Sequence, residues 1–295
     1  MFDQVLIAVD ESDHSRRAAM VGLAFATAYG ADIVVVHAVE DASSTTSTET
    51  GAQNHQGDDD ILTNISERAT DVGVTVETHA VEGKPPEVIV NQANESNVDL
   101  IVMGRQGRSG ISEQVLGSVT DRVLRSIDVP VLVVPSGGPV GADDSKFDRI
   151  LAPTDGSETA EQAAPYSTDI AKRHDATLHV LNVIDPRFEG IFSAGGGSEE
   201  FFERLEERGH DFIDQYIERS SQTAAETTTD VDIHKAVVRG TTSEEIEEYA
   251  VENDIDLVVM ASQGESGLTG QLLGSVADRT LRESEKPVLI IPPTE

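Results

Sequence analysis

Three glycines and a serine lie close together in the segment MGRQGRSGISEQVLGSV at residues 103–119. A backbone without β-carbons at Gly104, Gly107 and Gly117 can approach an oxyanion closely, and free N–H groups at a helix N-terminus bind it with help from the helix dipole. Ser118 adds a hydroxyl donor. The run follows the apolar segment DLIVM and precedes a segment with helical spacing. These residues predict a phosphate-binding loop between a strand and a helix; an ordinary glycine turn is the alternative.

Asp10 is the second residue that could contact such a ligand. It ends the first apolar run, VLIAVD. In an open α/β sheet, ligands bind outside the carboxyl ends of the strands, where the strand order reverses. We therefore expect Asp10 at the same edge of the sheet as the glycines, where its carboxylate can accept hydrogen bonds from ribose hydroxyls or from a base. A phosphate loop together with this carboxylate predicts a nucleotide site.

The whole pattern occurs twice, which favours the ligand interpretation over a chance turn. VLIAVDES at 5–12 matches ILAPTDGS at 150–157, and the glycine run matches MASQGESGLTGQLLGSV at 260–276. The final apolar runs, VPVLVVP at 129–135 and KPVLIIP at 286–292, match as well. The chain is therefore a tandem duplication. We expect domains at 1–138 and 146–295, joined by an exposed linker at about 136–147.

Short β-branched apolar runs alternate with segments of helical spacing in each copy. In the first copy we expect strands at 5–9, 33–39, 74–81, 100–103 and 131–134, and helices at 13–29, 86–97 and 112–127. The last of these helices would begin near Ser112 or near Gly117. Nearly unbroken apolar runs are typical of strands buried on both faces, as in a parallel sheet covered by helices. The sequence therefore predicts two doubly wound α/β domains.

Local signals predict where some helices begin and end. Asp13 and Ser15 are candidate caps of the first helix and Gly30 its stop, while Thr242 with Glu245 predicts a capping box in the second copy. Residues 41–60 are polar and without periodicity, which predicts a loop. The corresponding part of the second copy predicts an amphipathic helix from about residue 198. Its apolar side would pack on the sheet, with Phe201, Leu205, Phe212, Ile213, Tyr216 and Ile217.

The net charge is −33, and the acidic residues are spread over both copies. Residues 1–140 contain 21 acids and 8 bases, and residues 141–295 contain 33 acids and 13 bases. A nucleic-acid-binding surface needs a basic footprint, so no nucleic-acid partner is expected. The regular apolar runs argue against a disordered acidic protein. We interpret the charge as adaptation to concentrated salt, which points to a halophile with a salt-filled cytoplasm.

Other chemistry has little support in the sequence. There is no cysteine, which excludes disulfides and thiolate metal sites and favours a reducing, cytoplasmic location. No apolar stretch approaches the roughly 20 residues that cross a bilayer, so we expect no membrane partner. The histidines show no metal-ligand spacing, and we predict no protein-held metal site. No nucleophile elbow or Walker lysine occurs, so no catalytic residue and no efficient enzyme is predicted.

The combined motifs resemble the universal stress protein family, over essentially the whole chain. The family's G-x2-G-x9-G-[ST] run is intact in the first copy, and the Asp-x-Ser ending of the first strand and the P-V-L-V-V-P final strand match too. The resemblance implies parallel five-stranded sheets of order 3-2-1-4-5, paired within the chain through their last strands, with a homodimer as a further option. For the ATP-binding branch it implies bound ATP, ADP or AMP, with or without Mg²⁺, and a role in stress response or signalling through conformation or partner binding.

The resemblance also implies site residues, carried over position by position. In the first domain they are Ala8, Val9, Asp10, Ala38, Met103, Gly104, Gln106, Gly107, Gly117, Ser118 and Val119. In the second domain they are Pro153, Thr154, Asp155, Val183, Met260, Gln263, Gly264, Gly274, Ser275 and Val276.

The two copies depart from the family pattern in different ways. Ala261 replaces the first glycine of the second run, and Glu265 stands where the first copy has Arg108. Arg105 and Arg108 predict tighter triphosphate binding in the first copy. A ligand-free dimerising stress module is the alternative function, and slow ATP hydrolysis or adenylyl transfer is a third.

Overall fold

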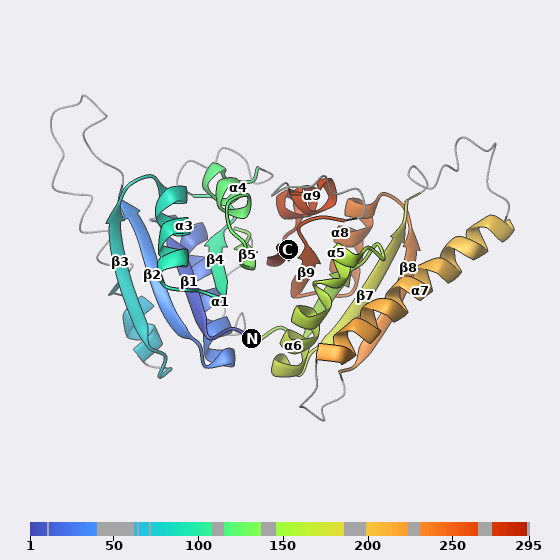
Figure 1. Cartoon of the computed structure of the whole chain (residues 1–295), viewed down its shortest axis with the longest axis horizontal. Helices are drawn as coiled ribbons and strands as arrows, with labels where there is room; N and C mark the ends of the chain where they lie inside the picture. The colour runs from blue at the N-terminus through green and yellow to red at the C-terminus, as the bar shows by residue number, and fades with distance from the viewer. Residues whose placement is uncertain are drawn as a thin grey trace. The chain divides into compact units, whose positions relative to one another are not determined.

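The computed structural model describes residues 1–10, 12–39, 62–63, 65–70, 72–107, 115–136, 146–185, 199–223, 231–264 and 273–293. The chain divides into two compact units, Met1–Lys146 and Phe147–Glu295. The division falls at the end of the linker expected from the sequence. Each unit is a doubly wound α/β domain whose described strands pair in parallel (Figure 1).

The first unit is built on five strands in the order β3-β2-β1-β4-β5. The strands are β1 (Gln4–Val9), β2 (Asp32–Val39), β3 (Val76–Glu82), β4 (Leu100–Gly104) and β5 (Val131–Val134). β1 lies between β2 and β4, with Val5 opposite both Ile33 and Leu100. This is the place where the strand order reverses.

Burial along the strands follows their position in the sheet. β4 and β5 are buried along their whole length, as are five of the six residues of β1. β3, by contrast, is partly exposed throughout, so the expectation that every strand is buried on both faces is wrong for it. β3 ends the strand order and is also rich in polar side chains, with Glu77, Thr78, His79 and Glu82 among its seven residues. It also begins at Val76 and ends at Glu82, slightly later than expected from the apolar run.

Helices cover both faces of the first sheet. α1 (Asp13–Tyr29) lies on one face, and α3 (Pro85–Glu95) and α4 (Ser118–Leu124) pack against each other on the opposite face (Figure 1). Gly30 ends α1 in the left-handed conformation, as predicted, and its N–H donates to carbonyls of the last turn.

The structure corrects one predicted helix start in this unit and decides between two alternatives for another. The N-cap of α1 is Ser12, whose side chain accepts from the N–H of Ser15, and neither Asp13 nor Ser15 is the cap. For α4 the later of the two predicted starts holds, because Gly117 is extended and is the N-cap of a helix that begins at Ser118. The helix ends at Leu124, before the end of the predicted span 112–127. The predicted loop at 41–60 and residues 108–114 lie outside the described residues.

The second unit repeats this arrangement, with strand order β10-β9-β6-β7-β8. Its strands are β6 (Arg149–Pro153), β7 (Thr177–Ile184), β8 (Ile233–Arg239), β9 (Leu257–Ala261) and β10 (Val288–Ile291). Its helices are α5 (Glu158–Glu161), α6 (Ala164–His174), α7 (Glu199–Thr223), α8 (Thr242–Glu252) and α9 (Ser275–Glu283). α6 and α7 pack together, and α8 and α9 pack together on the other face.

The long amphipathic helix α7 begins where the sequence places it and packs as expected. Leu205, Ile213 and Tyr216 are buried, and Tyr216 shares a 2.9 Å hydrogen bond with Ser167 of α6. The predicted capping box is wrong: α8 is preceded by Thr241 as N-cap, without a side-chain cap hydrogen bond. Among the described helices, none is both long enough and apolar enough to cross a membrane.

Candidate functional site

The predicted residues of the first unit meet at the carboxyl ends of β1, β2 and β4 and at the start of α4. Asp10 follows β1, Gly104 ends β4, and Ser118 begins α4. β1 and β4 are neighbours in the sheet, with Ile7 opposite Val102. The candidate site therefore lies at the point of strand reversal, where open α/β sheets bind ligands.

Asp10 is held in place by the serine that caps α1. Its Oδ1 atom accepts a 3.0 Å hydrogen bond from the N–H of Ser12 and a second one from the Ser12 hydroxyl. The Ser15 hydroxyl contacts the Asp10 backbone, accepting from its N–H at 3.1 Å. The Asp-x-Ser motif thus fixes the carboxylate and the helix start together.

The second unit forms the same local structure. Oδ1 of Asp155 accepts from the N–H and the hydroxyl of Ser157, at 3.0 Å and 2.6 Å. The Ser157 hydroxyl in turn accepts from the N–H of Ala160 at 3.1 Å, capping α5. The repetition shows that the geometry is encoded by the motif rather than by its surroundings.

The second glycine of each run lies against the other oxygen of this carboxylate. A β-carbon added to Gly107 would lie 2.6 Å from Oδ2 of Asp10, and one added to Gly264 would collide with Oδ2 of Asp155. These glycines are therefore required by the aspartates. The loop after the fourth strand and the aspartate after the first are close neighbours in both units.

The first glycine lies against α1 and against its own loop. A β-carbon on Gly104 would lie 3.3 Å from the β-carbon of His14 in α1 and 3.2 Å from the carbonyl oxygen of Gln106. The added methyl would thus lie against the protein itself. Ala261 takes this place in the second unit and is buried, so a methyl group is accommodated there within the protein.

The third glycine packs the start of the following helix onto the loop. The N–H of Gly117 donates to the carbonyl of Arg105 at 2.9 Å, and that of Gly274 donates to Ser262 at 2.7 Å. A β-carbon on Gly117 would lie 2.9 Å from that same carbonyl oxygen of Arg105. Neither glycine offers a side chain to cap its helix. Ser118 and Ser275, the first residues of α4 and α9, are exposed.

Two residues of the first loop are buried within the protein. Arg105 is 7% exposed and Gln106 is 7% exposed. The Gln106 side chain donates a 2.6 Å hydrogen bond to the carbonyl of Val115, which fixes the end of the loop. Arg105, which the sequence predicts beside the phosphates, is thus largely enclosed by the protein. Arg108 and Glu265 lie outside the described residues.

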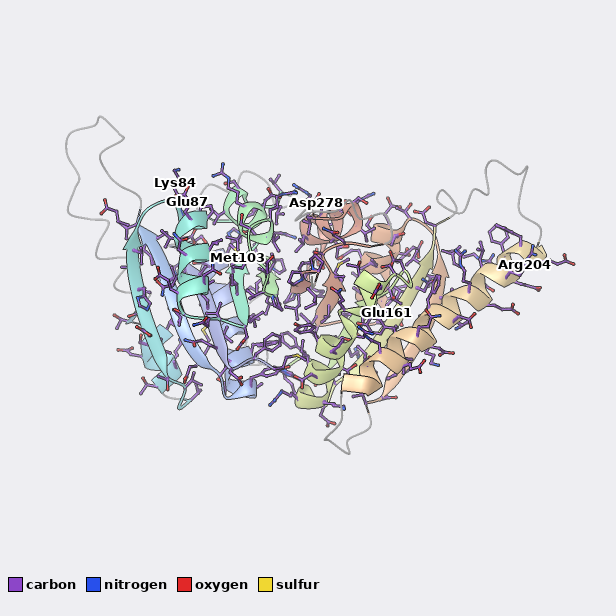
Figure 2. The ribbon with its side chains drawn as sticks, viewed as in Figure 1. Lys84, Glu87, Met103, Glu161, Arg204 and Asp278 are labelled. Atoms are coloured by element: carbon purple, nitrogen blue, oxygen red, sulfur yellow. The ribbon has the colours of Figure 1, made fainter. Side chains whose placement is uncertain are left out.

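The other predicted residues line the same edge of each sheet. Met103, labelled in Figure 2, lies in β4 and is buried, and Met260 is buried in β9. The remaining ones lie at strand ends or in the first helical turn: Ala8, Val9, Ala38 and Val119 in the first unit, and Pro153, Thr154, Val183, Gln263 and Val276 in the second.

Sequence reasoning missed one residue of the second strand in each unit. Nδ1 of His37 lies 3.1 Å from the carbonyl oxygen of Val9, and Nδ2 of Asn182 donates to the carbonyl of Thr154 at 2.8 Å. Both carbonyls belong to the residue just before the site aspartate. The available signal was positional, because His37 and Asn182 occupy matching places in the two repeats.

Asp121 and Asp278 lie on the helix surface one turn beyond Ser118 and Ser275, and each forms an ion pair at the end of its own helix. Arg125 contacts Asp121 at 2.9 Å, and Arg282 contacts Asp278 at 2.8 Å. In the part of the chain that the structure describes, no group of three or more acidic, histidine or cysteine side chains could hold a metal ion.

Two doubly wound domains in one chain, each with an aspartate and a glycine loop at the strand reversal, define a tandem Rossmann-like protein. A family model, "Universal stress protein family", matches residues 1–135 and 146–292. The chain therefore belongs to the universal stress protein family.

Individual relatives agree with this assignment. A universal stress protein of Methanocaldococcus jannaschii is 33% identical over 149 residues, which is 50% of this chain and 84% of that protein. One of Mycolicibacterium smegmatis is 29% identical over 222 residues, covering 75% of this chain and 70% of the relative. The crystal structure of a universal stress protein from Archaeoglobus fulgidus has a TM-score of 0.65 at 21% identity, covering 99% of this chain and 97% of that one. This last similarity is one of fold.

Proposed function

We propose that this protein binds an adenine nucleotide, ATP, ADP or AMP, at the carboxyl edge of each unit. The observation that carries the proposal is the repeated pairing of an oriented aspartate with an uncapped helix start. In both units Oδ1 of the aspartate is occupied by the motif serine, while Oδ2 faces the loop glycine. Two units that differ in most residues retain this arrangement.

The nucleotide would be divided between these groups according to their chemistry. The helix starts at Ser118 and Ser275 offer backbone N–H groups and an exposed hydroxyl, which suit phosphate oxygens. The carboxylates of Asp10 and Asp155 accept hydrogen bonds, which suits ribose hydroxyls. Backbone groups near Ala38 and Val183 would then lie beside the base. Mg²⁺ would accompany the phosphates and needs no protein ligand set.

We propose further that the output is a conformation or a partnership in the cytoplasm of a salt-adapted cell. The site aspartates are held by serines as hydrogen-bond acceptors, which suits binding better than turnover. The absence of cysteine and the charge of −33 support the compartment and the salt adaptation. The two sheets would pair through β5 and β10, each the last strand of its own unit's order.

Calorimetric titration of ATP, ADP and AMP into the full chain in molar KCl with Mg²⁺ tests the binding. We expect saturable binding at two sites, and Asp10→Asn together with Asp155→Asn should weaken it about tenfold or more. A hydrogen bond to a charged group contributes about 1.5–3 kcal/mol, and about 1.4 kcal/mol corresponds to tenfold. Asn keeps an oxygen for the motif serine, so the fold should be retained.

Asp13→Asn is the matched control, because Asp13 is an exposed neighbour that pairs with Arg16 on the helix surface. It should leave nucleotide affinity unchanged. The alternative function, a ligand-free dimerising module, predicts no heat of binding and no nucleotide in a mass spectrum of small molecules released from the purified protein. Either result in a folded sample would overturn the proposal.

A further inference from the structure

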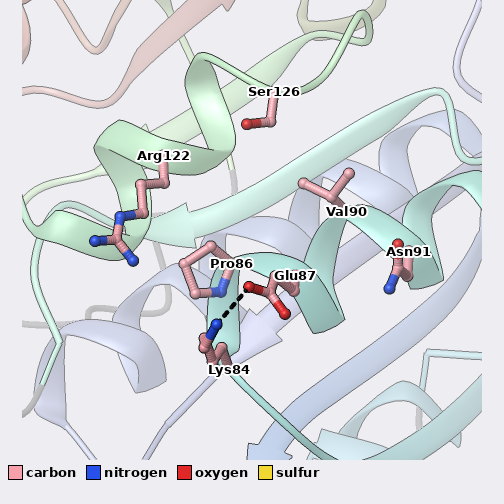
Figure 3. A pocket seen from close by; sticks show the side chains of 7 residues that line it. All are labelled: Lys84, Pro86, Glu87, Val90, Asn91, Arg122 and Ser126. Atoms are coloured by element: carbon pink, nitrogen blue, oxygen red, sulfur yellow. Dashed lines mark hydrogen bonds and ion pairs between the residues drawn. The ribbon is translucent and has the colours of Figure 1, made fainter.

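A groove of about 320 Å³ lies between α3 and α4 in the first unit (Figure 3). It is lined by Lys84, Pro86, Glu87, Val90, Asn91, Arg122 and Ser126. Figure 3 shows Lys84 and Arg122 toward one end and Asn91 and Ser126 toward the other, with Pro86 and Val90 along α3 between them. The groove thus has a cationic end, an apolar wall and a polar end.

Arg122 is the unusual member of this lining. It is exposed, and within the described part of the chain it has no hydrogen bond and no ion pair. Lys84 contacts Glu87 at 3.0 Å, with both side chains about two-thirds exposed or more. A surface pair of this kind contributes little to stability, so it can be exchanged for a ligand at small cost.

The second unit provides an internal comparison, because its α8 and α9 match α3 and α4 position by position. Arg279, which matches Arg122, contacts Glu244 at 3.0 Å and Glu283 at 2.9 Å. These two carboxylates raise the pKa of Arg279, and Glu283 has the larger effect. The positive charge of Arg279 is therefore balanced by two carboxylates of its own unit.

The other matching positions are also more acidic in the second unit. Thr241 replaces Lys84, while Glu247, Glu248 and Glu283 replace Val90, Asn91 and Ser126. The lining has a net charge of +1 in the first unit and −3 at the matching positions of the second. Glu87 and its counterpart Glu244 are the acidic residue common to both linings, but only Arg279 is paired with it. In a chain with a net charge of −33, an exposed arginine with no ion pair among the described residues needs an explanation.

From these observations we propose that the α3–α4 groove of the first unit binds a small organic oxyanion, with a phosphate or a carboxylate between Lys84 and Arg122. Guanidinium groups recognise either oxyanion through two parallel hydrogen bonds. Pro86 and Val90 would contact the body of the ligand, and Asn91 and Ser126 would bind a polar group at its far end. The volume is at the lower end of the range for small-molecule sites. None of the lining residues is among the proposed nucleotide contacts, although Arg122 lies one turn beyond Ser118 in α4.

The test uses the full chain and follows the Nε–Hε signals of its arginines by NMR. Potassium phosphate or potassium acetate replaces KCl at constant ionic strength, so that simple screening does not change. We expect a saturable shift of the Arg122 signal, identified by its loss in Arg122→Gln. A response to phosphate alone indicates a phosphorylated ligand, and a response to acetate alone indicates a carboxylate.

Matched variants separate a site from a solvated cation. Lys84→Thr should weaken the binding at least about threefold, and Asn91→Glu with Ser126→Glu, which introduces residues of the second unit, should abolish it. Arg279→Gln should leave it unchanged. Amide signals of Gly107 and Gly117 report the proposed nucleotide site in the same spectra, so the two sites are distinguished.

No saturable shift with either anion, in a sample with native amide dispersion, would overturn the proposal. The same conclusion follows if Lys84→Thr titrates like the unaltered chain. Arg122 and Lys84 are exposed, so neither substitution should unfold the protein, and unchanged melting temperatures would verify this.

Discussion

Oδ2 of Asp10 lies where a side chain at residue 107 would begin, only 2.6 Å from the position of a β-carbon added to Gly107. Gly107→Ala must therefore move the loop or the carboxylate. Overpacking of this kind costs about 1–3 kcal/mol, and we expect lower stability and weaker nucleotide binding. Urea unfolding and calorimetry would measure both effects.

Gly104→Ala is the matched control for that substitution. Its methyl would contact His14 and the Gln106 carbonyl at 3.2–3.3 Å, and the second unit already accommodates alanine at this place. We expect a loss of less than about 1 kcal/mol, since small shifts relieve such contacts. If both variants lost the same stability and affinity, the assigned difference between the two glycines would be wrong.

The two nucleotide sites should differ in affinity. We expect the first unit to bind ATP more tightly, by about tenfold, which corresponds to about 1.4 kcal/mol. Arg108 stands where the second unit has Glu265, and near a phosphate a unit charge contributes about 1 kcal/mol in water. Titrating ATP into Asp155→Asn and into Asp10→Asn measures each remaining site separately. Tighter binding in Asp10→Asn would reverse the order.

The proposed pairing of β5 with β10 predicts a pattern of hydrogen exchange. In a strand at the end of a sheet, alternate backbone N–H groups have no partner and exchange quickly. If the last strands pair, all amides of Val131–Val134 and Val288–Ile291 should be protected. β3 and β8 are internal controls, because they end their own strand orders on the other side. Alternate fast exchange in β5 and β10 would exclude the pairing.

Substitution gives a second test of the same pairing. Leu132 and Leu289 are fully buried, and Asp at either place should cause aggregation or separation of the domains. Light scattering and limited proteolysis would detect these outcomes. Tolerance of both substitutions would contradict the pairing.

Acid should weaken the second unit through His179. Its ring stacks on His234 with centroids 5.0 Å apart, and its Nδ1 atom lies 2.9 Å from the Tyr249 hydroxyl. Burial, the neighbouring His234 and Arg149 lower the pKa of His179, while Asp232 opposes them. The folded state therefore favours the neutral ring, and stability present above the usual histidine pKa of about 6.5 should be lost as the pH falls below it.

Urea unfolding between pH 5 and 8 at constant KCl measures this loss. His234→Gln removes one cause of the lowered pKa, so its stability should fall less steeply with acid than that of the unaltered chain. Identical profiles for the two proteins would show that the stacked pair does not control the effect.

Stability should also depend on salt. With a net charge of −33, repulsion between carboxylates acts over the Debye length, which grows from about 3 Å at 1 M to about 30 Å at 0.01 M salt. The melting temperature should therefore fall as KCl decreases from molar to millimolar concentration. An unchanged melting temperature across this range would remove the basis for salt adaptation.

The strands and most helices could be predicted from the sequence because their apolar residues recur with the period at which each element contacts the hydrophobic core. Val5–Val9 and Leu100–Met103 are apolar because helices cover both faces of the sheet around them. The duplicated motifs placed Asp10 and the glycine run at one edge through topology alone. That prediction required no knowledge of side-chain geometry.

What escaped prediction depends on which atoms meet across the fold. A glycine in a sequence does not reveal its neighbour, so Gly104, which approaches α1, looked the same as Gly107, which approaches Asp10. The cap of α1 was misplaced because Ser12 also binds the carboxylate two residues before it. The capping box of α8 failed because the helix begins at Thr242 itself. To predict each of these contacts one would need the distance between two atoms in the folded chain, and the periodicity of the sequence does not give it.

The contacts of His37 and Asn182 have a consequence for searches by motif. A carbonyl oxygen only accepts hydrogen bonds, so His37 must carry a proton on Nδ1 to donate to the Val9 carbonyl. Asn182 supplies an equivalent N–H to Thr154 from an unrelated side chain. This position of the second strand in each unit thus holds a hydrogen-bond donor to the carbonyl before the site aspartate, and chemically different residues can supply it. A search for similar sites should therefore score hydrogen-bonding capacity at this position, since residue identity would separate two halves of the same molecule.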